Sequence, residues 1–498
     1  MFESINDPWW IDSQDAPQVR LSDLLPEARF VACDEIVVSR CQSDPERCGP
    51  GDVFFAQPTG PADGHELVAR AIARGAAGIV AERIVPTSGI PLCLVPDAAW
   101  AFARTAHALA GDPAGGMKLI AITGTSGKTT TAWLTAAVLA EAGLRVGVLS
   151  DLGCLDADAT APEAADLERP EVLARWLRRL AAGGCTHAVL EVSSRMLAGH
   201  VLAGIECDTV VVTNLAKAHL ECHGTTEAYH AIKARIIDSL APNGCLVANA
   251  DDERVRRLIP RHPGPSMTAG LKQDADLTAT PVERGLFGQT VLLRAGGHVA
   301  PLSLATPVAS FARDALFAAA VGLRYRVPLE RITRGLEAAG TVAGRMERID
   351  RGQEMAVFLD RPTSGHALAT TLASLRRLAP GRLVMLAEEG IAASLGEGCR
   401  FTIRAARWCD ETIVVPGGVV DDQPGDEAAA AYARLDSLLS SLGEGDCVLV
   451  LGDALRRQGD PGDPGDPAAE AAPRLSLAAL VDGWLQLAHP PAWDRRAA

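Results

Sequence analysis

The sequence predicts an α/β protein of three domains, with a central parallel sheet that carries a phosphate-binding loop and a Rossmann-like sheet in the C-terminal part. Three observations support this fold class. The chain has 498 residues, and domains of about 150 residues each would divide it into three. Short apolar runs alternate with amphipathic segments along most of the chain, as in sheets covered by helices on both faces. A glycine-rich loop separates a buried strand from a helix near residue 124.

The first block of elements covers residues 1–112. Its short apolar runs predict strands, and one amphipathic segment predicts a helix. The strands are expected over Glu35–Ser39, Val53–Ala56, Gly78–Ala81 and Leu92–Val95, and the helix over Leu67–Arg74. The stretch Gly111–Gly116 reads as a linker, so we place a domain boundary near residue 112.

The glycine-rich loop opens the second block, residues 113–341. The apolar run Lys118–Thr123 suits a buried strand, and residues 129–142 suit a helix that ends at Gly143. Between them, Gly124 and Gly127 allow a tight turn whose N–H groups can surround an anion at the helix N-terminus.

The side chains after the loop complete a nucleotide signal. Lys128 would reach the outer phosphates, and the Thr129 hydroxyl would reach a bound Mg²⁺. The usual spacing places a glycine at position 122, where this chain has Ile122. The alternative is an incidental glycine turn before a helix, but the strand–loop–helix context favours a nucleotide.

Lysine is rare in this chain, which makes the lysines it keeps informative. Of 47 basic residues, five are lysines, namely Lys118, Lys128, Lys217, Lys233 and Lys272. An arginine cannot replace a compact ammonium beside a phosphate, and it cannot act as a neutral amine.

Composition excludes several classes of function. A net charge of −15 without a basic aromatic patch argues against a nucleic-acid partner. The twelve cysteines include no Cys-x-x-Cys pair, and a disulfide framework is not expected in a chain of this size. The N-terminus lacks the pattern of a signal peptide, and no apolar run reaches the roughly 18 residues of a membrane span. We therefore expect a soluble cytoplasmic protein.

Polar residues follow several predicted strands of the second block. The strand Thr186–Leu190 leads to Glu191, Asp208–Val212 to Asn214, and Cys245–Ala248 to Asn249. Ligands of open parallel sheets bind outside the carboxyl ends of the strands. These strand ends and the glycine-rich loop therefore predict one site, although each polar strand end alone is also typical of a strand that enters a loop.

Two further residues suggest metal chemistry. Lys233 lies next to the apolar stripe of a predicted helix, where burial would lower its pKa and leave a nucleophilic amine. His219 and Glu191 could bind Mg²⁺ if phosphates complete its shell, while a lone histidine is more often a surface residue.

The third block, residues 342–498, resumes the alternation of strands and helices. Strands are expected over Met355–Asp360, Leu383–Ala387, Thr412–Val415 and Cys447–Leu451, and helices over 366–378, near 400, and over 426–441 and 475–487. The Gly-Asp-Pro repeats within Gly459–Ala472 predict a low-complexity loop.

Several ordered motifs in the first two blocks resemble those of the Mur ligases, and within them the UDP-N-acetylmuramyl-tripeptide synthetases. They are Thr-Gly-Thr-Ser-Gly-Lys-Thr-Thr (123–130), Glu-Val-Ser-Ser (191–194), Thr-Asn-Leu…His-Leu-Glu-Cys-His-Gly (213–224), Tyr-His-Ala-Ile-Lys-Ala-Arg (229–235), Asn-Ala-Asp-Asp (249–252) and Gly-Arg-Met-Glu (344–347). Ser39-Arg40, Pro50-Gly-Asp-Val-Phe-Phe-Ala56 and Asp63-Gly-His65 resemble the UDP-binding domain of those enzymes. The resemblance covers residues 35–350.

The resemblance implies ATP-dependent amide-bond formation on a UDP-N-acetylmuramyl peptide during peptidoglycan synthesis. A substrate carboxylate would attack the γ-phosphate of ATP, and the amine of an amino acid would open the resulting acyl phosphate. The N-terminal domain would bind the UDP-substrate, the central domain ATP, and the divergent C-terminal domain would complete the ligase. The enzyme would use Mg²⁺, and we expect a monomer.

The resemblance also assigns roles to single residues. Lys128, Lys233, His219 and Glu191 would be catalytic. Thr129 would hold one Mg²⁺, and Glu191, His219 and a carbamylated Lys233 would hold a second. The ATP-binding residues would be Gly124, Thr125, Ser126, Gly127, Lys128, Thr129, Thr130, Asn249, Arg345 and Asp360. The substrate-binding residues would be Ser39, Arg40, Thr160, Ser193, Ser194 and His200.

The chain departs from the family pattern in both the second and the third block. Ala218 replaces an aspartate before His219, and His200 replaces an arginine. The motif that selects a diamino acid is absent after Val415, where Pro-Gly-Gly-Val follows, and Asp360-Arg-Pro-Thr-Ser-Gly-His366 replaces another family motif. Two functions therefore stay open: a ligase, or a catalytically impaired paralog that binds ATP or a UDP-muramyl peptide.

Overall fold

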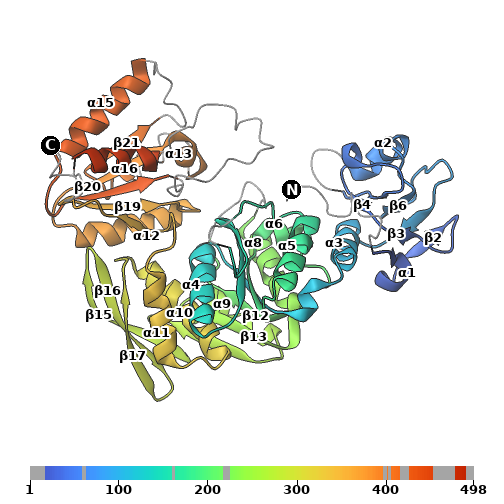
Figure 1. Ribbon diagram of the computed structural model, residues 1–498, viewed down its shortest axis with the longest axis horizontal. Helices are drawn as coiled ribbons and strands as arrows, with labels where there is room; N and C mark the ends of the chain where they lie inside the picture. Colours follow the sequence, from blue (N-terminus) through green and yellow to red (C-terminus); the bar gives the residue numbers. More distant parts are fainter. Residues whose placement is uncertain are drawn as a thin grey trace.

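The computed structural model describes residues 17–58, 63–159, 163–216, 225–395, 401, 405–415, 426–452 and 477–488. Figure 1 shows three α/β units in sequence order, from the blue N-terminal part through the green and yellow centre to the orange C-terminal part. Each unit is built around its own sheet. The predicted α/β class with a central parallel sheet is confirmed.

The first unit has a small sheet in the order β2-β7-β6-β5-β4. Its strands are β2 (Arg29–Val31), β4 (Cys41–Gln42), β5 (Val53–Phe55), β6 (Gly78–Ala81) and β7 (Leu92–Leu94); β1 (Val19–Arg20) and β3 (Val37–Val38) form a separate pair. Its helices are α1 (Leu21–Leu24), α2 (Val68–Ala73) and α3 (Ala98–Leu109). Buried β5 and β6 alternate their side chains between two apolar clusters, one of which includes α3.

The central unit has a ten-stranded sheet in the order β10-β9-β11-β8-β12-β13-β14-β15-β16-β17. The strands are β8 (Lys118–Thr123), β9 (Val146–Ser150), β10 (Gly153–Leu155), β11 (His187–Glu191), β12 (Cys207–Val212), β13 (Leu240–Asn249), β14 (Ser266–Gly270), β15 (Leu277–Gly285), β16 (Gly288–Ala295) and β17 (His298–Leu304). The run from β9 to β15 is parallel, whereas β10, β16 and β17 pair antiparallel.

Helices cover both faces of this sheet. They are α4 (Lys128–Glu141), α5 (Pro170–Ala182), α6 (Ser194–Ala198), α8 (Thr226–Ala234), α9 (Glu253–Arg256), α10 (Ala309–Arg324) and α11 (Leu329–Ala339). Because successive strand residues point to opposite faces, Ile120 and Ile122 pack towards α4 and α10, while Leu119 and Ala121 pack towards α5. A strand buried on both faces must be apolar throughout, which is why Lys118–Thr123 was recognisable as a strand.

The third unit has a sheet in the order β18-β19-β22-β20-β21, with β18 antiparallel to its neighbour. Its strands are β18 (Glu347–Ile349), β19 (Ala356–Asp360), β20 (Leu383–Glu388), β21 (Glu411–Val415) and β22 (Cys447–Leu451), and its helices α12 (Gly365–Leu378), α13 (Glu389–Leu395), α15 (Asp426–Ser440) and α16 (Leu477–Ala488). Leu368 and Leu372 of α12 join the apolar cluster that also holds α10, and Figure 1 shows α12 on the side of the central unit.

One expectation about the elements needs correction. The central block was expected to alternate strands and helices throughout, but β15, β16 and β17 form an antiparallel meander at one edge of the sheet. The helix expected near residue 400 falls mostly on residues outside the described ranges, where residues 401 and 405 are helical; α13, directly after β20, is a separate helix that ends at Leu395.

The first and central units meet along α3. His107 is buried, and its Nε2 lies 2.8 Å from the carbonyl oxygen of Val201. Burial lowers the pKa of His107 to about 4, although the Val201 carbonyl favours the protonated ring. No helix in the described part of the chain is both long and apolar enough to cross a bilayer.

This contact predicts a pH-dependent stability. The pKa of a histidine in the unfolded chain is near 6.5. Between that pH and the lower pKa of folded His107, the unfolded chain binds a proton that the folded protein does not bind, which favours unfolding. The free energy of unfolding should therefore fall by about 2 kcal/mol from pH 7.5 to 5 because of this residue. Urea unfolding of the wild type and His107→Gln at both pH values measures it, since glutamine does not titrate. Equal losses in the two proteins would contradict the prediction.

Candidate functional site

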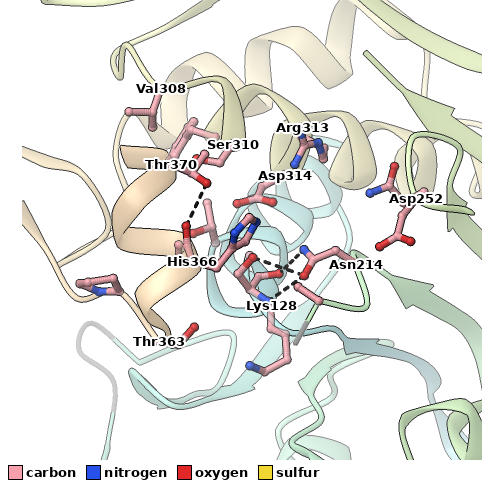
Figure 2. A pocket seen from close by; sticks show the side chains of 18 of the residues that line it. Lys128, Asn214, Asp252, Val308, Ser310, Arg313, Asp314, Thr363, His366 and Thr370 are labelled. Atoms are coloured by element: carbon pink, nitrogen blue, oxygen red, sulfur yellow. Dashed lines mark hydrogen bonds between the residues drawn. The ribbon is translucent and has the colours of Figure 1, made fainter. Parts of the chain in front are cut away.

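A cavity of about 980 Å³ lies where the central and third units meet. Its walls come from the start of α4, the segments after β12 and β13, the first turns of α10, and residues 345–371 of the third unit. Figure 2 shows Lys128 and Asn214 beside the glycine-rich loop, Ser310, Arg313 and Asp314 of α10 above them, and Thr363, His366 and Thr370 of the third unit, with Thr370 next to Ser310.

The glycine-rich loop is held open at the N-terminus of α4. Gly127 has φ +81°, the left-handed region, and a Cβ there would collide with the carboxyl of Asp314. A Cβ on Gly124 would collide with the hydroxyl of Thr213. Only glycine therefore fits both positions. The N–H groups of Thr125 and Ser126 donate to Asn214, so the N–H groups that could face an anion are those after Gly127, in the first turn of α4.

Asn214, which lies just after the neighbouring strand β12, holds the loop in place through hydrogen bonds. Its Oδ1 accepts a hydrogen bond from the Ser126 backbone N–H at 3.1 Å, and its Nδ2 donates to the Ser126 carbonyl at 2.9 Å. The Thr213 hydroxyl also donates to that carbonyl, at 2.7 Å. In turn, Asn249 Nδ2 donates to the Thr213 carbonyl at 2.6 Å. The polar strand ends predicted from the sequence therefore form one connected network.

Lys128 and Glu191 form a buried ion pair beneath the loop. Lys128 Nζ lies 3.5 Å from Glu191 Oε1, and the two residues are 9% and 2% exposed. Burial opposes ionisation of Glu191, but the charges of Lys128 and Arg345 outweigh it and hold its pKa below the usual value. Among the residues that the structure describes, Glu191 Oε1 nevertheless has no hydrogen-bond partner. It is a desolvated carboxylate oxygen with capacity for a further cation.

Asp151 stands beside this pair. Its backbone N–H donates to Glu191 Oε2 at 3.2 Å. Loss of solvent around the carboxyl and the charge of Glu191 raise the pKa of Asp151 to about 6. Sequence reasoning missed this residue because its relation to Glu191 depends on the pairing of β9 with β11.

Lys233 is buried on α8, as its place beside the apolar stripe predicted. It is 2% exposed, and its Nζ donates to the Thr123 hydroxyl at 3.4 Å and lies 5.1 Å from the centre of the Tyr229 ring. Burial and then the charge of Lys128 drive its pKa well below the usual value. The structure thus provides a buried amine that is readily neutral.

Arg345 joins the two units at the cavity. Its Nη2 donates to the Thr129 hydroxyl at 3.2 Å, and its Nη1 donates to the Arg361 carbonyl. Asp360, at the end of β19, accepts a hydrogen bond from the Met346 N–H at 3.2 Å. Burial raises the pKa of Asp360 to about 6, against the effect of Arg345.

Comparison with known proteins places these features in a family. Residues 122–322 match the family model described as the Mur ligase middle domain. A UDP-N-acetylmuramoyl-L-alanyl-D-glutamate--2,6-diaminopimelate ligase of Chlorobium phaeobacteroides is 32% identical to this chain, over 71% of each. The chain belongs to the Mur ligase family.

Further relatives agree with this membership. A UDP-N-acetylmuramyl-tripeptide synthetase of Roseiflexus is 31% identical to this Mur ligase, over 81% of this chain and 82% of that one. The solved structure of a UDP-N-acetylmuramoyl-L-alanyl-D-glutamate--2,6-diaminopimelate ligase has the same fold, with a TM-score of 0.67 at 21% identity, over 87% of this chain and 93% of the other.

Most of the expected ATP-binding residues of this Mur ligase line the cavity. They are Ser126, Gly127, Lys128, Thr129, Thr130, Asn249, Arg345 and Asp360. Gly124 and Thr125 do not line it, and Thr125 is buried with its hydroxyl donating to the Ala216 carbonyl at 3.2 Å. The roles of these residues stay predictions. His219 lies outside the described residues, as does Thr160.

The expected substrate-binding residues lie elsewhere. Ser193 caps α6 and donates to Glu168 Oε1 at 3.0 Å, next to buried Ser194. His200 Nε2 lies 3.2 Å from Asp97 Oδ2. In the first unit Arg40, preceded by Ser39, pairs with Asp52 at 2.8 Å.

Sequence reasoning missed the contribution of α10 to the cavity, and most of the contribution of the third unit beyond Arg345 and Asp360. Asp314 is buried against Gly127, and burial raises its pKa well above the usual value. A charged residue inside the apolar segment 311–321 was the available signal. Thr363 and His366 carried no such signal, because only the docking of the third unit brings them to the cavity.

The left-handed backbone at Gly127 predicts a loss of function on substitution. Gly127→Ala should destabilise the loop by about 1 kcal/mol or more from the left-handed backbone alone, and the collision with Asp314 adds to this. A lower thermal midpoint and weaker nucleotide binding are expected. Gly115→Ala is the matched control, since a Cβ there meets no atom within 4 Å. Equal behaviour of the two variants would contradict the role of Gly127.

Proposed function

We propose that this chain is an ATP-dependent ligase that adds an amino acid to a UDP-N-acetylmuramyl peptide through an acyl phosphate. The observation that carries the proposal is the meeting of three groups under one loop: Lys128, buried Glu191, and the buried amine of Lys233. A protein that only binds a nucleotide requires the loop lysine, Lys128, but not a second, buried lysine such as Lys233 whose pKa is lowered. The presence of Lys233 therefore favours the ligase. The names of the relatives supply the substrate class.

In this proposal the cavity binds ATP. The loop N–H groups and Lys128 would hold the phosphates, and Arg345 would add a second positive charge from the third unit. Asn249 and Asp360 would lie along the nucleotide. A solved structure of a Mur ligase from Thermotoga maritima in complex with ADP has a related fold, with a TM-score of 0.55 at 21% identity, over 83% of this chain and 93% of the other.

The residues present fit Mg²⁺. Glu191 offers a buried oxygen that faces Lys128 and accepts no hydrogen bond from the described residues, and Thr129 offers a hydroxyl within reach of Glu191. Within the described ranges, no group of three His, Cys, Asp or Glu side chains could hold a metal ion, and phosphate oxygens often complete such shells. Bound Mg²⁺ would neutralise charge that develops on the transferred phosphoryl group. His219 would join Glu191 in this role.

Lys233 would act as a carbamate. A neutral amine attacks CO₂, forms an N–C bond and loses a proton, which replaces a cation by an anion. Burial that disfavours the ammonium form favours this reaction, and the neighbouring charge of Lys128 would stabilise the carbamate. The anion would then help to hold the metal beside the acyl phosphate.

The remaining assignments complete the proposal. Residues 1–112 would bind the UDP group, with Ser39 and Arg40 in contact with it, while Thr160, Ser193, Ser194 and His200 would contact the muramyl peptide. Residues 113–341 would bind ATP, and residues 342–498 would close over it. The ligase would work as a monomer in the cytoplasm.

The proposal is tested by phosphate release from ATP with UDP-MurNAc-L-Ala-D-Glu and a panel of amino acids. We expect release with one class of amino acid, but not with meso-diaminopimelate or lysine, because the motif that selects them is absent after Val415. Arg361 is the candidate for the incoming carboxylate, since it follows β19 and lines the cavity. Efficient ligation of diaminopimelate would contradict the specificity. Release with none, while ATP binds, would identify a binding paralog instead.

The carbamate predicts a defined mutant. Lys233→Ala should lower turnover by roughly a hundredfold or more, as when a group that stabilises developing charge is removed. Formate or acetate should restore part of the activity by replacing the carbamate. Lys118→Ala is the matched lysine control, since Lys118 is exposed and pairs with Asp208 at the opposite end of β8. Full activity of Lys233→Ala would show that Lys233 only packs on its helix.

A further inference from the structure

A second carboxylate lies beside Glu191, and the proposed ligase chemistry assigns it no role. Asp151 directly follows β9, which pairs in parallel with β11, so Asp151 and Glu191 emerge at the same edge of the sheet. The Asp151 N–H donates to Glu191 Oε2 at 3.2 Å, and the two carboxyl groups are within hydrogen-bond reach of each other. Two carboxylates at this separation repel each other unless a cation or a proton lies between them.

The positive charges next to this carboxylate pair belong to the two residues, Lys128 and Arg345, that would bind the phosphates of ATP in the proposed function. Lys128 lies 3.5 Å from Glu191, and Lys128 and Arg345 both act on Asp151 as well as on Glu191. Lys128 and Arg345 line the nucleotide cavity, whereas the two carboxylates do not. Phosphates in the cavity would take up the positive charge of Lys128 and Arg345. The carboxylate pair would then need a cation of its own.

The donors at this point suit a hard divalent cation. Glu191 Oε1 is buried and accepts no hydrogen bond from any described residue, and the Thr129 hydroxyl lies against the same carboxylate. Part of Asp151 stays exposed although neighbouring groups crowd its carboxyl, so an ion can approach it from solvent. Mg²⁺ sites next to phosphates commonly use one or two carboxylates and fill the remaining positions with water and phosphate oxygens.

We propose that Asp151 is a second carboxylate ligand, together with Glu191, of a divalent cation between the nucleotide phosphates and the acceptor carboxylate. The inference rests on the proposed function, because it assumes that phosphates occupy the cavity. It also agrees with the sequence around His219, where Ala218 leaves the chain one carboxylate short of the motif that it resembles. Asp151 would supply that charge from a different strand.

The test measures metal binding without turnover. The full chain is saturated with a non-hydrolysable ATP analogue and titrated with Mn²⁺, and free Mn²⁺ is followed by electron paramagnetic resonance. Wild type should bind one Mn²⁺ beyond the ion carried by the analogue. Asp151→Asn should weaken that second ion by roughly tenfold or more, since even outer partners of metal ligands contribute this much, and Asp151→Glu should retain it within a few-fold.

Two further variants separate the outcomes. Asp158→Asn is the matched control, because Asp158 is exposed and pairs with Arg145 at 2.6 Å; it should bind Mn²⁺ as wild type does. Glu191→Gln should lose the second ion. If Glu191→Gln loses it while Asp151→Asn keeps wild-type affinity, the inference is wrong and the proposed function stands. If wild type binds no second ion, both fail. Unchanged thermal midpoints in Asp151→Asn and Asp151→Glu would exclude misfolding as the cause of any loss.

Discussion

The ion pair between Lys128 and Glu191 is the interaction on which the rest of the site depends. Two charged side chains lose most of their hydration beneath the glycine-rich loop, and their opposite charges partly offset the free-energy cost of burying them. Their positions follow from the sheet, because β8 and β11 are neighbours and both end at this edge. Glycines at 124 and 127 let the loop pass over the pair without closing the space that an anion needs.

The pair also connects the two halves of the cavity. Arg345 comes from the segment that leads into the third unit, yet it donates to Thr129 and contributes to the ionisation of Glu191. Any movement of the third unit relative to the central sheet would therefore change the charge around Glu191. The positive charge of Lys128 also acts on Lys233, where, together with burial, it lowers the pKa of the amine. Binding of a polyanion in the cavity would couple the loop, the buried amine and the third unit.

The sequence predicted the parts of this arrangement that depend on local pattern. The strand Lys118–Thr123 has the bounds expected for it, because a strand buried on both faces reads as a continuous apolar run. The burial of Lys233 followed from its position beside an apolar stripe. Asp151, Asp314 and His366 were not recognised, because each depends on a contact between segments that no local pattern encodes. The meander β15–β17 was missed because the preceding alternation of strands and helices was extended beyond its true end.

The central claim is that the acceptor carboxylate is activated by phosphorylation at the Lys128–Glu191 pair, and one isotope experiment tests it most directly. A UDP-muramyl peptide labelled with ¹⁸O in its terminal carboxylate would be incubated with ATP, Mg²⁺ and the accepted amino acid, and the released phosphate would be analysed by mass spectrometry. Attack of that carboxylate on the γ-phosphate, followed by opening of the acyl phosphate by the amine, transfers one labelled oxygen to phosphate. The account predicts phosphate that carries one ¹⁸O from the substrate. Phosphate without the label, released alongside the amide product, would contradict it.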